Sequence, residues 1–349
     1  MRSCLQMGLH RDTVDRNERG FLQTDLRRRV FWTAYCIGRA VCSALQRPLS
    51  IPDPAISTEL LSGASDQTIA ATGSGSDGSV TKTRALQWIE FSQLKSAMIE
   101  VQFQGKSLED GQTLDTWLEQ MELLLNDWGK KYSHLDEAGG NWPPGMSLSS
   151  AIARLHSPSP QMPVLLPNSL LVAFEATSVA ARHQIEGLSS GLIHCPWIDA
   201  RDMFQMGITL LFCIRNGYET ICERFSLRDI VETTKIFTMY FLSAAEKGWS
   251  EILKYAGAYE RLCGPLLETV FLSRGMEKPL TTAVSFDAIS FNAIHDAELM
   301  RLLYPGPAQL DKLRFGRNRG PAPVVPDIRD RWDIFEASDI FPFLDTIQL

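Results

Sequence analysis

Residues 26–35, LRRRVFWTAY, carry the strongest pattern in this chain of 349 residues. The three arginines lead into apolar residues near helical spacing, Val30, Ala34, Ile37 and Val41, with Phe31, Trp32 and Tyr35 beside them. This pattern predicts an amphipathic helix with a thick aromatic face and a basic first turn. Cations at a helix N-terminus oppose the macrodipole. We therefore expect carboxylate partners for the arginines, and the nearby acids are Asp12, Asp15, Glu18 and Asp25.

The helix should stop before Arg47-Pro48, because a proline forces the preceding residue out of the α region. Pro48, Pro52 and Pro54 then favour an extended chain. The sequence therefore predicts a helix held by ion pairs and followed by a rigid extended segment. We interpret this arrangement as an internal structural brace and not as a reaction site.

Three pieces in this order, MGLHRD at 7–12, the arginine-rich helix and QRPLSIPD at 46–53, resemble a known family. It is the fungal-specific transcription factor domain, or middle homology region, of the binuclear zinc cluster transcription factors. The resemblance is close over residues 4–60 and weaker near 242–262. It assigns a structural role to His10, Arg11, Asp12, Arg27, Arg28, Arg29, Trp32, Tyr35, Arg39, Arg47, Pro48 and Asp53.

This chain departs from the family pattern at four positions. Met7 stands for the first leucine, Asp25 for the usual glutamate, and Gln46 for the glycine before Arg47-Pro48. Gly38-Arg39 replaces the usual Asp-Arg pair, which removes one carboxylate from the family's internal ion pairs.

Composition excludes several classes of function. The chain is 44% hydrophobic, enough for a large core, and its net charge is −7, which disfavours non-specific binding of nucleic acids by its surface. No run of eighteen apolar residues exists, and residues 207–214 are too short to span a bilayer. No apolar signal sequence is present at the N-terminus. We expect a soluble intracellular protein without a membrane partner.

The seven cysteines are scattered, at positions 4, 36, 42, 195, 213, 222 and 263, without a Cys-x-x-Cys motif. This distribution is typical of free thiols in a reducing compartment and provides no zinc site. The resemblance implies six clustered cysteines in an N-terminal module that these residues do not contain. We therefore expect no cofactor in this chain, with zinc only in that module. The early position of MGLHRD predicts a truncated gene model or a shortened paralogue.

The fold class predicted from periodicity is all-α, a multi-helix stacked regulatory domain over residues 1–304. Helices are expected from about 84, from about 113 to a C-cap at Gly129, and at about 166–186, 199–224, 228–247, 249–273 and 286–304. Almost no alternation of period two is present. Glycine-, serine- and proline-rich stretches predict flexible loops near 62–84 and 134–163.

Two segments follow the predicted domain. Residues 305–330 form a proline-rich basic linker with Lys312, Arg314, Arg317 and Arg319, which we interpret as a solvated loop. Residues 331–349 mix acids with the bulky side chains of Trp332, Phe335, Phe341 and Phe343. Two interpretations of this tail remain open. It is either an activation segment that contacts a coactivator or a tail that packs on the helices.

Three patterns have the appearance of catalytic motifs. Gly187-Leu-Ser-Ser-Gly191 matches a nucleophile elbow, which requires a strand before it, whereas here a predicted helix precedes it. Gly105-Lys-Ser107 lacks the first glycine of a phosphate-binding loop, and His194-Cys195 lies in a predicted loop. We therefore predict that the protein is not an enzyme.

The resemblance implies a transcriptional regulator in the nucleus, acting as a homodimer or heterodimer. DNA contact would come only indirectly or through the zinc module. The alternative is a helical ligand-sensing or interaction protein without direct DNA binding, whose tryptophans and methionines enclose an apolar pocket.

Overall fold

The structure is a computed structural model, and it describes residues 1–12, 20–44, 48–72, 79–137, 144–191, 196–275 and 293–303. The chain divides into two units, residues 1–312 and 313–349, and all described residues belong to the first. Within the described residues the secondary structure is helical, and the β pairing is limited to one isolated bridge between Ser159 and Met162. The all-α prediction is confirmed.

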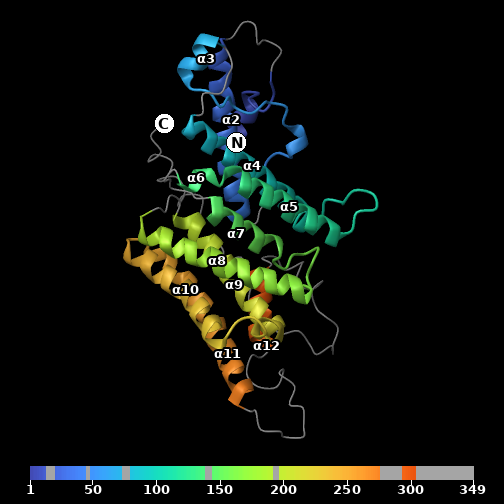
Figure 1. Cartoon of the computed structure of the whole chain (residues 1–349), viewed down its shortest axis with the longest axis vertical. Helices are drawn as coiled ribbons and strands as arrows, with labels where there is room; N and C mark the ends of the chain where they lie inside the picture. Colours follow the sequence, from blue (N-terminus) through green and yellow to red (C-terminus); the bar gives the residue numbers. More distant parts are fainter. Residues whose placement is uncertain are drawn as a thin grey trace. The chain divides into compact units, whose positions relative to one another are not determined.

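The first half of this unit contains α1 (Arg2–Gln6), α2 (Phe21–Ala44), η2 (Asp53–Ala55), α3 (Asp66–Thr72), α4 (Val80–Gln102), α5 (Leu114–Tyr132) and α6 (His134–Glu137). The second half contains α7 (Pro144–Leu155), α8 (Pro167–Ser189), α9 (Pro196–Cys222), α10 (Leu227–Glu246), η3 (Ser250–Ile252), α11 (Leu253–Gly275) and α12 (Ala293–Leu303) (Figure 1). The bounds of α8, α9, α10 and α11 agree with the predicted helices to within a few residues.

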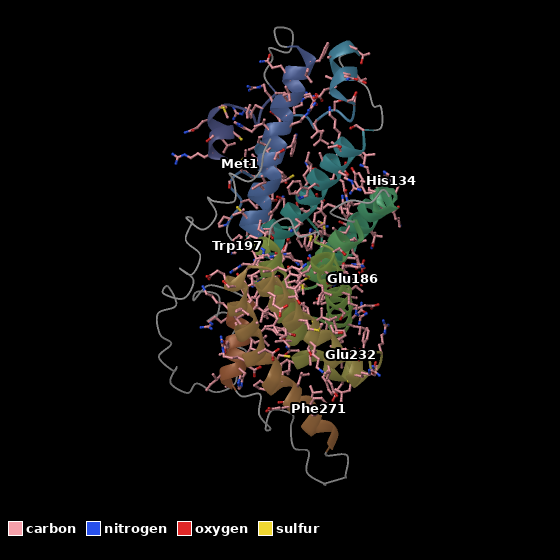
Figure 2. All side chains as sticks on the ribbon, turned by 90° about the vertical axis from the view of Figure 1, so that its left-hand side faces the viewer. Met1, His134, Glu186, Trp197, Glu232 and Phe271 are labelled. Carbon is pink, nitrogen blue, oxygen red and sulfur yellow. The ribbon has the colours of Figure 1, made fainter. Side chains whose placement is uncertain are left out.

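The helices pack as one continuous stack. α2 packs on α4, α4 on α5, α5 on α7 and α7 on α8, and α9 then packs against α8, α10, α11 and α12. Side chains from neighbouring helices fill the space between them (Figure 2). Each helix therefore buries part of its apolar surface on its neighbours in the stack.

The two predicted loops each contain a helix, so both predictions need correction. α3 lies inside residues 62–84, where Ile69 is buried. α7 lies inside residues 134–163, where Ala151, Ala153 and Leu155 are buried. Composition was misleading because small residues allow α7 to approach α8 closely, and tertiary packing then overrides a weak helix propensity.

The prediction that Gly129 ends α5 is wrong. The helix continues to Tyr132. A Cβ atom at position 129 would lie 2.8 Å from Cδ2 of Leu148 on α7. The glycine therefore permits a close approach of α7 to α5.

Several predictions lie outside the described residues. They concern Asp15, Glu18, Arg47, the pair His194-Cys195, the linker at 305–330 and the tail with Trp332, Phe335, Phe341 and Phe343. α12 covers the second part of the helix predicted at 286–304. In the part of the chain that is described, no helix is long and apolar enough to cross a lipid bilayer.

Candidate functional site: the brace between α2 and the strap

The resemblance motifs meet along one side of α2. The segment from Pro48 to Ser65, named the strap here, runs beside α2 and leads into α3. The brace is the set of polar contacts that join α2 to the strap and to the residues beside it. Its members on α2 are Asp25, Arg28, Arg29, Trp32, Tyr35 and Arg39.

The MGLHRD piece forms the turn that anchors the middle of the strap. Gly8 has φ +65°, a conformation that favours glycine, and it directs the chain away from α1. The His10 carbonyl then accepts hydrogen bonds from the Ser57 and Thr58 amides at 3.0 and 3.2 Å. Asp12 accepts from Thr58 Oγ1 at 3.1 Å. The MGLHRD piece is therefore a backbone turn in which the Asp12 carboxylate binds the strap.

Asp12 and Glu59 share Arg28. The Arg28 guanidinium lies 2.9 Å from Asp12 and 2.6 Å from Glu59, and the Glu59 amide donates to Asp12 at 3.2 Å. A carboxylate partner for Arg28 was expected, and Asp12 was among the candidates. Arg27, by contrast, donates to the Met7 carbonyl at 3.5 Å.

A second cluster surrounds the buried carboxylate of Asp25, which is 3% exposed. It accepts from Arg29 Nε at 2.7 Å and from the Ser62 amide at 2.6 Å, and Lys82 Nζ lies 3.4 Å away. Arg29 also binds Asp66, the first residue of α3. This hydrogen bond lowers the pKa of Asp66 and raises that of Arg29. The cluster ties α2, the strap, α3 and α4 together.

The third cluster lies near the C-terminal end of α2. Arg39, 3% exposed, donates to the Ile51 carbonyl at 2.7 Å and to Asp53 at 2.5 Å. The Tyr35 hydroxyl donates to the same carboxylate at 3.0 Å, and its ring lies 4.3 Å from the Arg39 guanidinium. Burial raises the pKa of Tyr35 to about 12. Asp53 therefore holds two buried side chains of α2 in place.

The predicted aromatic face of α2 is confirmed, because Phe31, Trp32 and Tyr35 are buried. Val30, which belongs to the apolar spacing, is 50% exposed. These aromatic side chains pack in a core cluster with Cys4, Leu9, Cys36, Leu61 and Ile89. The Trp32 indole also donates to the Glu59 carbonyl at 2.9 Å. Phe31, Trp32 and Tyr35 therefore face the core, and from this side of α2 the Trp32 indole and the Tyr35 hydroxyl also reach the strap.

The prediction of a basic first turn is also wrong. α2 begins at Phe21, so Arg27, Arg28 and Arg29 are its seventh to ninth residues. The macrodipole acts mainly within the first turn, so it costs these cations little. Their partners compensate for desolvation instead.

Two motif residues take no part in these contacts: the Pro48 side chain is exposed, and Arg11 is exposed without an ion pair to any described residue. The sequence analysis missed Glu59, Ser62, Asp66 and Lys82, which come from outside the quoted motifs. Of these, only Glu59 and Asp66 carried a signal in the sequence, since their negative charge makes them possible partners of the arginines.

The arginines of the brace that lie on α2, Arg28, Arg29 and Arg39, are paired with carboxylates. The described residues contain no group of His, Cys, Asp and Glu placed to hold a metal ion. Ser189 of the apparent nucleophile elbow lies in the last turn of α8 and donates to the Ile185 carbonyl at 2.8 Å. It therefore lacks the strand-to-helix turn that such a nucleophile needs.

Comparison with known proteins agrees with the motifs. Residues 1–130 match the model of the fungal specific transcription factor domain. The chain is 21% identical over 227 residues to the pyrimidine pathway regulatory protein 1 of Saccharomyces cerevisiae. This alignment covers 61% of this chain and 25% of the relative. It is 42% identical over 52 residues to an uncharacterized transcriptional regulatory protein of Schizosaccharomyces pombe, covering 14% of this chain and 6% of the relative.

The chain thus spans a quarter or less of the length of these curated relatives. No solved structure matches it. The matched region holds α1 to α5 and the whole brace. Over residues 1–130, the chain is therefore similar to the fungal specific transcription factor domain.

Proposed function

We propose that this protein is a transcriptional regulator that acts in the nucleus, with the helical stack as its regulatory body. The observation that carries this proposal is the family match over residues 1–130, whose motif residues form the brace. Both relatives described above are named as regulators, one of them of transcription.

Contact with DNA would come from outside the stack. The net charge of −7 opposes direct binding to a polyanion, and no clustered cysteines are present in these 349 residues. A zinc cluster module or a partner chain, in a homodimer or heterodimer, would supply the DNA contact. In this arrangement the helical stack controls the activity of a protein that is already at the promoter.

The brace has a structural part in this proposal. It holds α2, the strap, α3 and α4 as one rigid element. A rigid element can pass a change at one end of a helical stack to the other. We therefore expect weakening of the brace to alter regulation as well as stability.

A reporter assay tests the proposal. The whole chain is fused to a heterologous DNA-binding domain in yeast, with a reporter gene carrying its binding site. The fusion should change reporter expression several-fold relative to the DNA-binding domain alone. Equal expression, with the fusion shown to be present in the nucleus at the same level, would contradict it.

A pair of variants separates the brace from the rest of the molecule. Arg39→Met removes a buried cation from the brace and should change the reporter effect. Arg228→Met removes an exposed arginine that pairs with Glu232 on the outside of α10, and it should behave as the unmodified fusion.

A further inference from the structure

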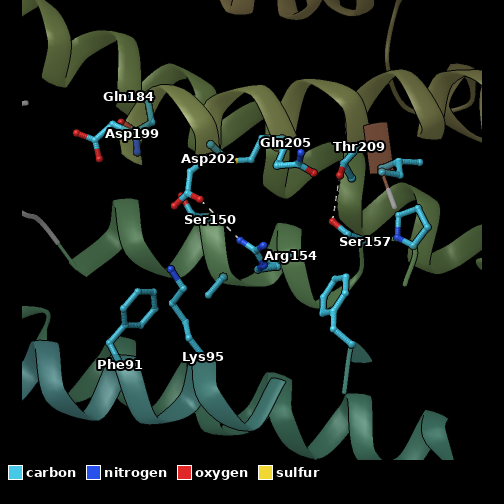
Figure 3. A pocket seen from close by; sticks show the side chains of 15 residues that line it. Phe91, Lys95, Ser150, Arg154, Ser157, Gln184, Asp199, Asp202, Gln205 and Thr209 are labelled. Carbon is cyan, nitrogen blue, oxygen red and sulfur yellow. Dashed lines mark hydrogen bonds and ion pairs between the residues drawn. The ribbon is translucent and has the colours of Figure 1, made fainter. Parts of the chain in front are cut away.

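A cavity of about 70 Å³ lies between α4, α7, α8, α9 and α12, away from the brace (Figure 3). Its wall is mixed. Phe91 and Met206 supply apolar surface, while Lys95, Arg154, Asp199 and Asp202 supply charge. The sequence had suggested an apolar pocket enclosed by tryptophans and methionines, but no tryptophan lines this cavity. A ligand here would be chosen by its charges.

Lys95 is the central group. It projects from α4 toward Asp202 and Ser150 (Figure 3). Among the described residues, none forms a hydrogen bond or ion pair with its ammonium group, and its recorded contact is the Phe91 ring, 5.6 Å away. Burial lowers the pKa of Lys95. The Lys95 side chain is half-buried, and its ammonium has no direct ion pair among the described residues, so the site can take a further anionic group.

The facing groups are loosely arranged. Arg154 Nη1 lies 3.8 Å from Asp202 Oδ1, too far for a hydrogen bond. Arg154 Nε is buried and has no hydrogen-bond partner among the described residues. Each of these groups can accept a further partner without giving up a strong existing one.

Size and charge together select the ligand. A water needs about 10–15 Å³ of such space, so the cavity holds about five waters or a molecule of about six non-hydrogen atoms. Two cations and two carboxylates line it, so its formal charge is zero. A simple anion or cation would find as much repulsion as attraction, whereas a molecule with both charges matches both sets.

We propose that this cavity binds a small zwitterion, an α-amino acid of about the size of alanine, with its carboxylate at Lys95 and Arg154 and its ammonium at Asp202. The carboxylate would give Lys95 the counterion that it lacks. The cavity lies at the junction of five helices, so a bound molecule would change how they pack.

Three small molecules that differ in their charged groups test this on the purified whole chain. L-alanine carries both charges, propionate lacks the ammonium, and ethylammonium lacks the carboxylate. At about 10 mM, L-alanine should raise the melting temperature by about 2–4 °C, as expected for a dissociation constant on the order of 1 mM. Propionate and ethylammonium should give no shift.

Variants place the effect in the cavity. Lys95→Met keeps the side-chain volume and removes a half-buried charge that forms no ion pair with a described residue, so the protein should stay folded while the alanine shift is lost. Asp202→Asn should lose it as well. Lys130→Met, at a lysine whose side chain is 79% exposed on α5, is the matched control and should keep the full shift.

Two results would overturn the inference. One is the absence of any shift with L-alanine. The other is an equal shift with propionate or in Lys95→Met, which would show that the cavity does not recognise both charges. Because the readout is binding by the purified protein, it is independent of the reporter assay.

Discussion

At the scale of single residues, the buried charges of α2 explain why its pattern is so strict. Arg39 and Asp25 are each 3% exposed, and a charge in such a place is tolerated only with a counterion and further hydrogen bonds. Arg39 has Asp53 and the Ile51 carbonyl, and Asp25 has Arg29 and the Ser62 amide. Arg39 thus depends on the Asp53 carboxylate of the strap, and Asp25 on the backbone amide of Ser62.

Asp53→Asn should therefore destabilise the protein strongly. The change leaves the Arg39 guanidinium buried without a counterion, which costs about 3 kcal/mol. Chemical denaturation followed by circular dichroism measures this loss. Glu232→Gln, in an exposed ion pair of α10, should leave the denaturation midpoint unchanged. Similar midpoints for the two variants would show that Arg39 does not depend on Asp53.

Tyr35 predicts how stability changes at alkaline pH. Its pKa is about 12 in the folded protein, against an ordinary value of 10, because burial favours the neutral phenol. The folded state thus binds this proton more tightly. The resulting contribution to stability is complete below pH 10 and is lost as the pH rises toward 12.

Tyr35→Phe removes that contribution. Between pH 10 and 12 the variant should lose less stability than the wild type. The slopes of unfolding free energy against pH should differ by an amount that corresponds to at most one bound proton. Melting temperatures across this range measure the difference. Parallel curves would mean that Tyr35 ionises as easily in the folded protein as in the unfolded chain.

At the scale of secondary-structure elements, the long helices could be predicted from the sequence, and the short ones could not. In α8 to α11 the apolar residues repeat at helical spacing over many turns. A long pattern of this kind still predicts a helix when one residue departs from it. α3 and α7 are short and rich in small or polar residues, so their helical state depends on contacts that a local pattern does not contain. The role of Gly129 likewise depends on a tertiary contact, the close approach of Leu148 on α7, which a local sequence pattern does not contain.

The site was predictable in part. Asp12, Asp25, Arg39 and Asp53 were identifiable because motifs contain them, although their pairing was not visible. Lys82 and Asp66 belong to α4 and α3, and only the fold brings them to Arg29 and Asp25. The partners of Trp32, Tyr35 and Arg39 were not predictable, because they lie on the strap and, for Tyr35, also at Ser96 on α4.

A pair of helix-interior glycines tests the packing of the elements. A Cβ at Gly207 in α9 would lie 2.9 Å from the Tyr259 ring and 3.1 Å from the Phe237 ring, both fully buried. Gly207→Ala should cost about 1–3 kcal/mol because these rings must move.

Gly257→Ala is the control, since nothing lies within 4 Å of the added carbon on α11. This variant should gain up to about 1 kcal/mol from helix propensity. Thermal unfolding of both variants gives the comparison. Stabilisation of both would mean that α9 and α11 are farther apart than the structure places them.

At the scale of the whole molecule, the helical stack contains the brace and the charged cavity. The tail at 331–349 contains four aromatic residues, for which a coactivator contact and packing on the helices are the two interpretations. If the tail is an activation segment, replacing Trp332, Phe335, Phe341 and Phe343 by alanine in the reporter fusion should lower expression several-fold.

The same variant distinguishes the other interpretation of the tail. A tail that packs on the helices would lower the melting temperature when its aromatic side chains are removed. It would leave the output of a folded fusion unchanged. Ser338→Ala with Thr346→Ala changes the tail without removing aromatic surface, and it should have neither effect.

The central claim is that the strap is held along α2 by the brace, and hydrogen exchange of the strap amides tests it most directly. The Ser57, Thr58, Glu59 and Ser62 amides all donate to anchored oxygens although they lie outside any helix. Peptides covering residues 56–63 should exchange slowly in the wild type and faster in Asp12→Asn. Exchange at the rate of an unstructured peptide in the folded wild type would contradict the account.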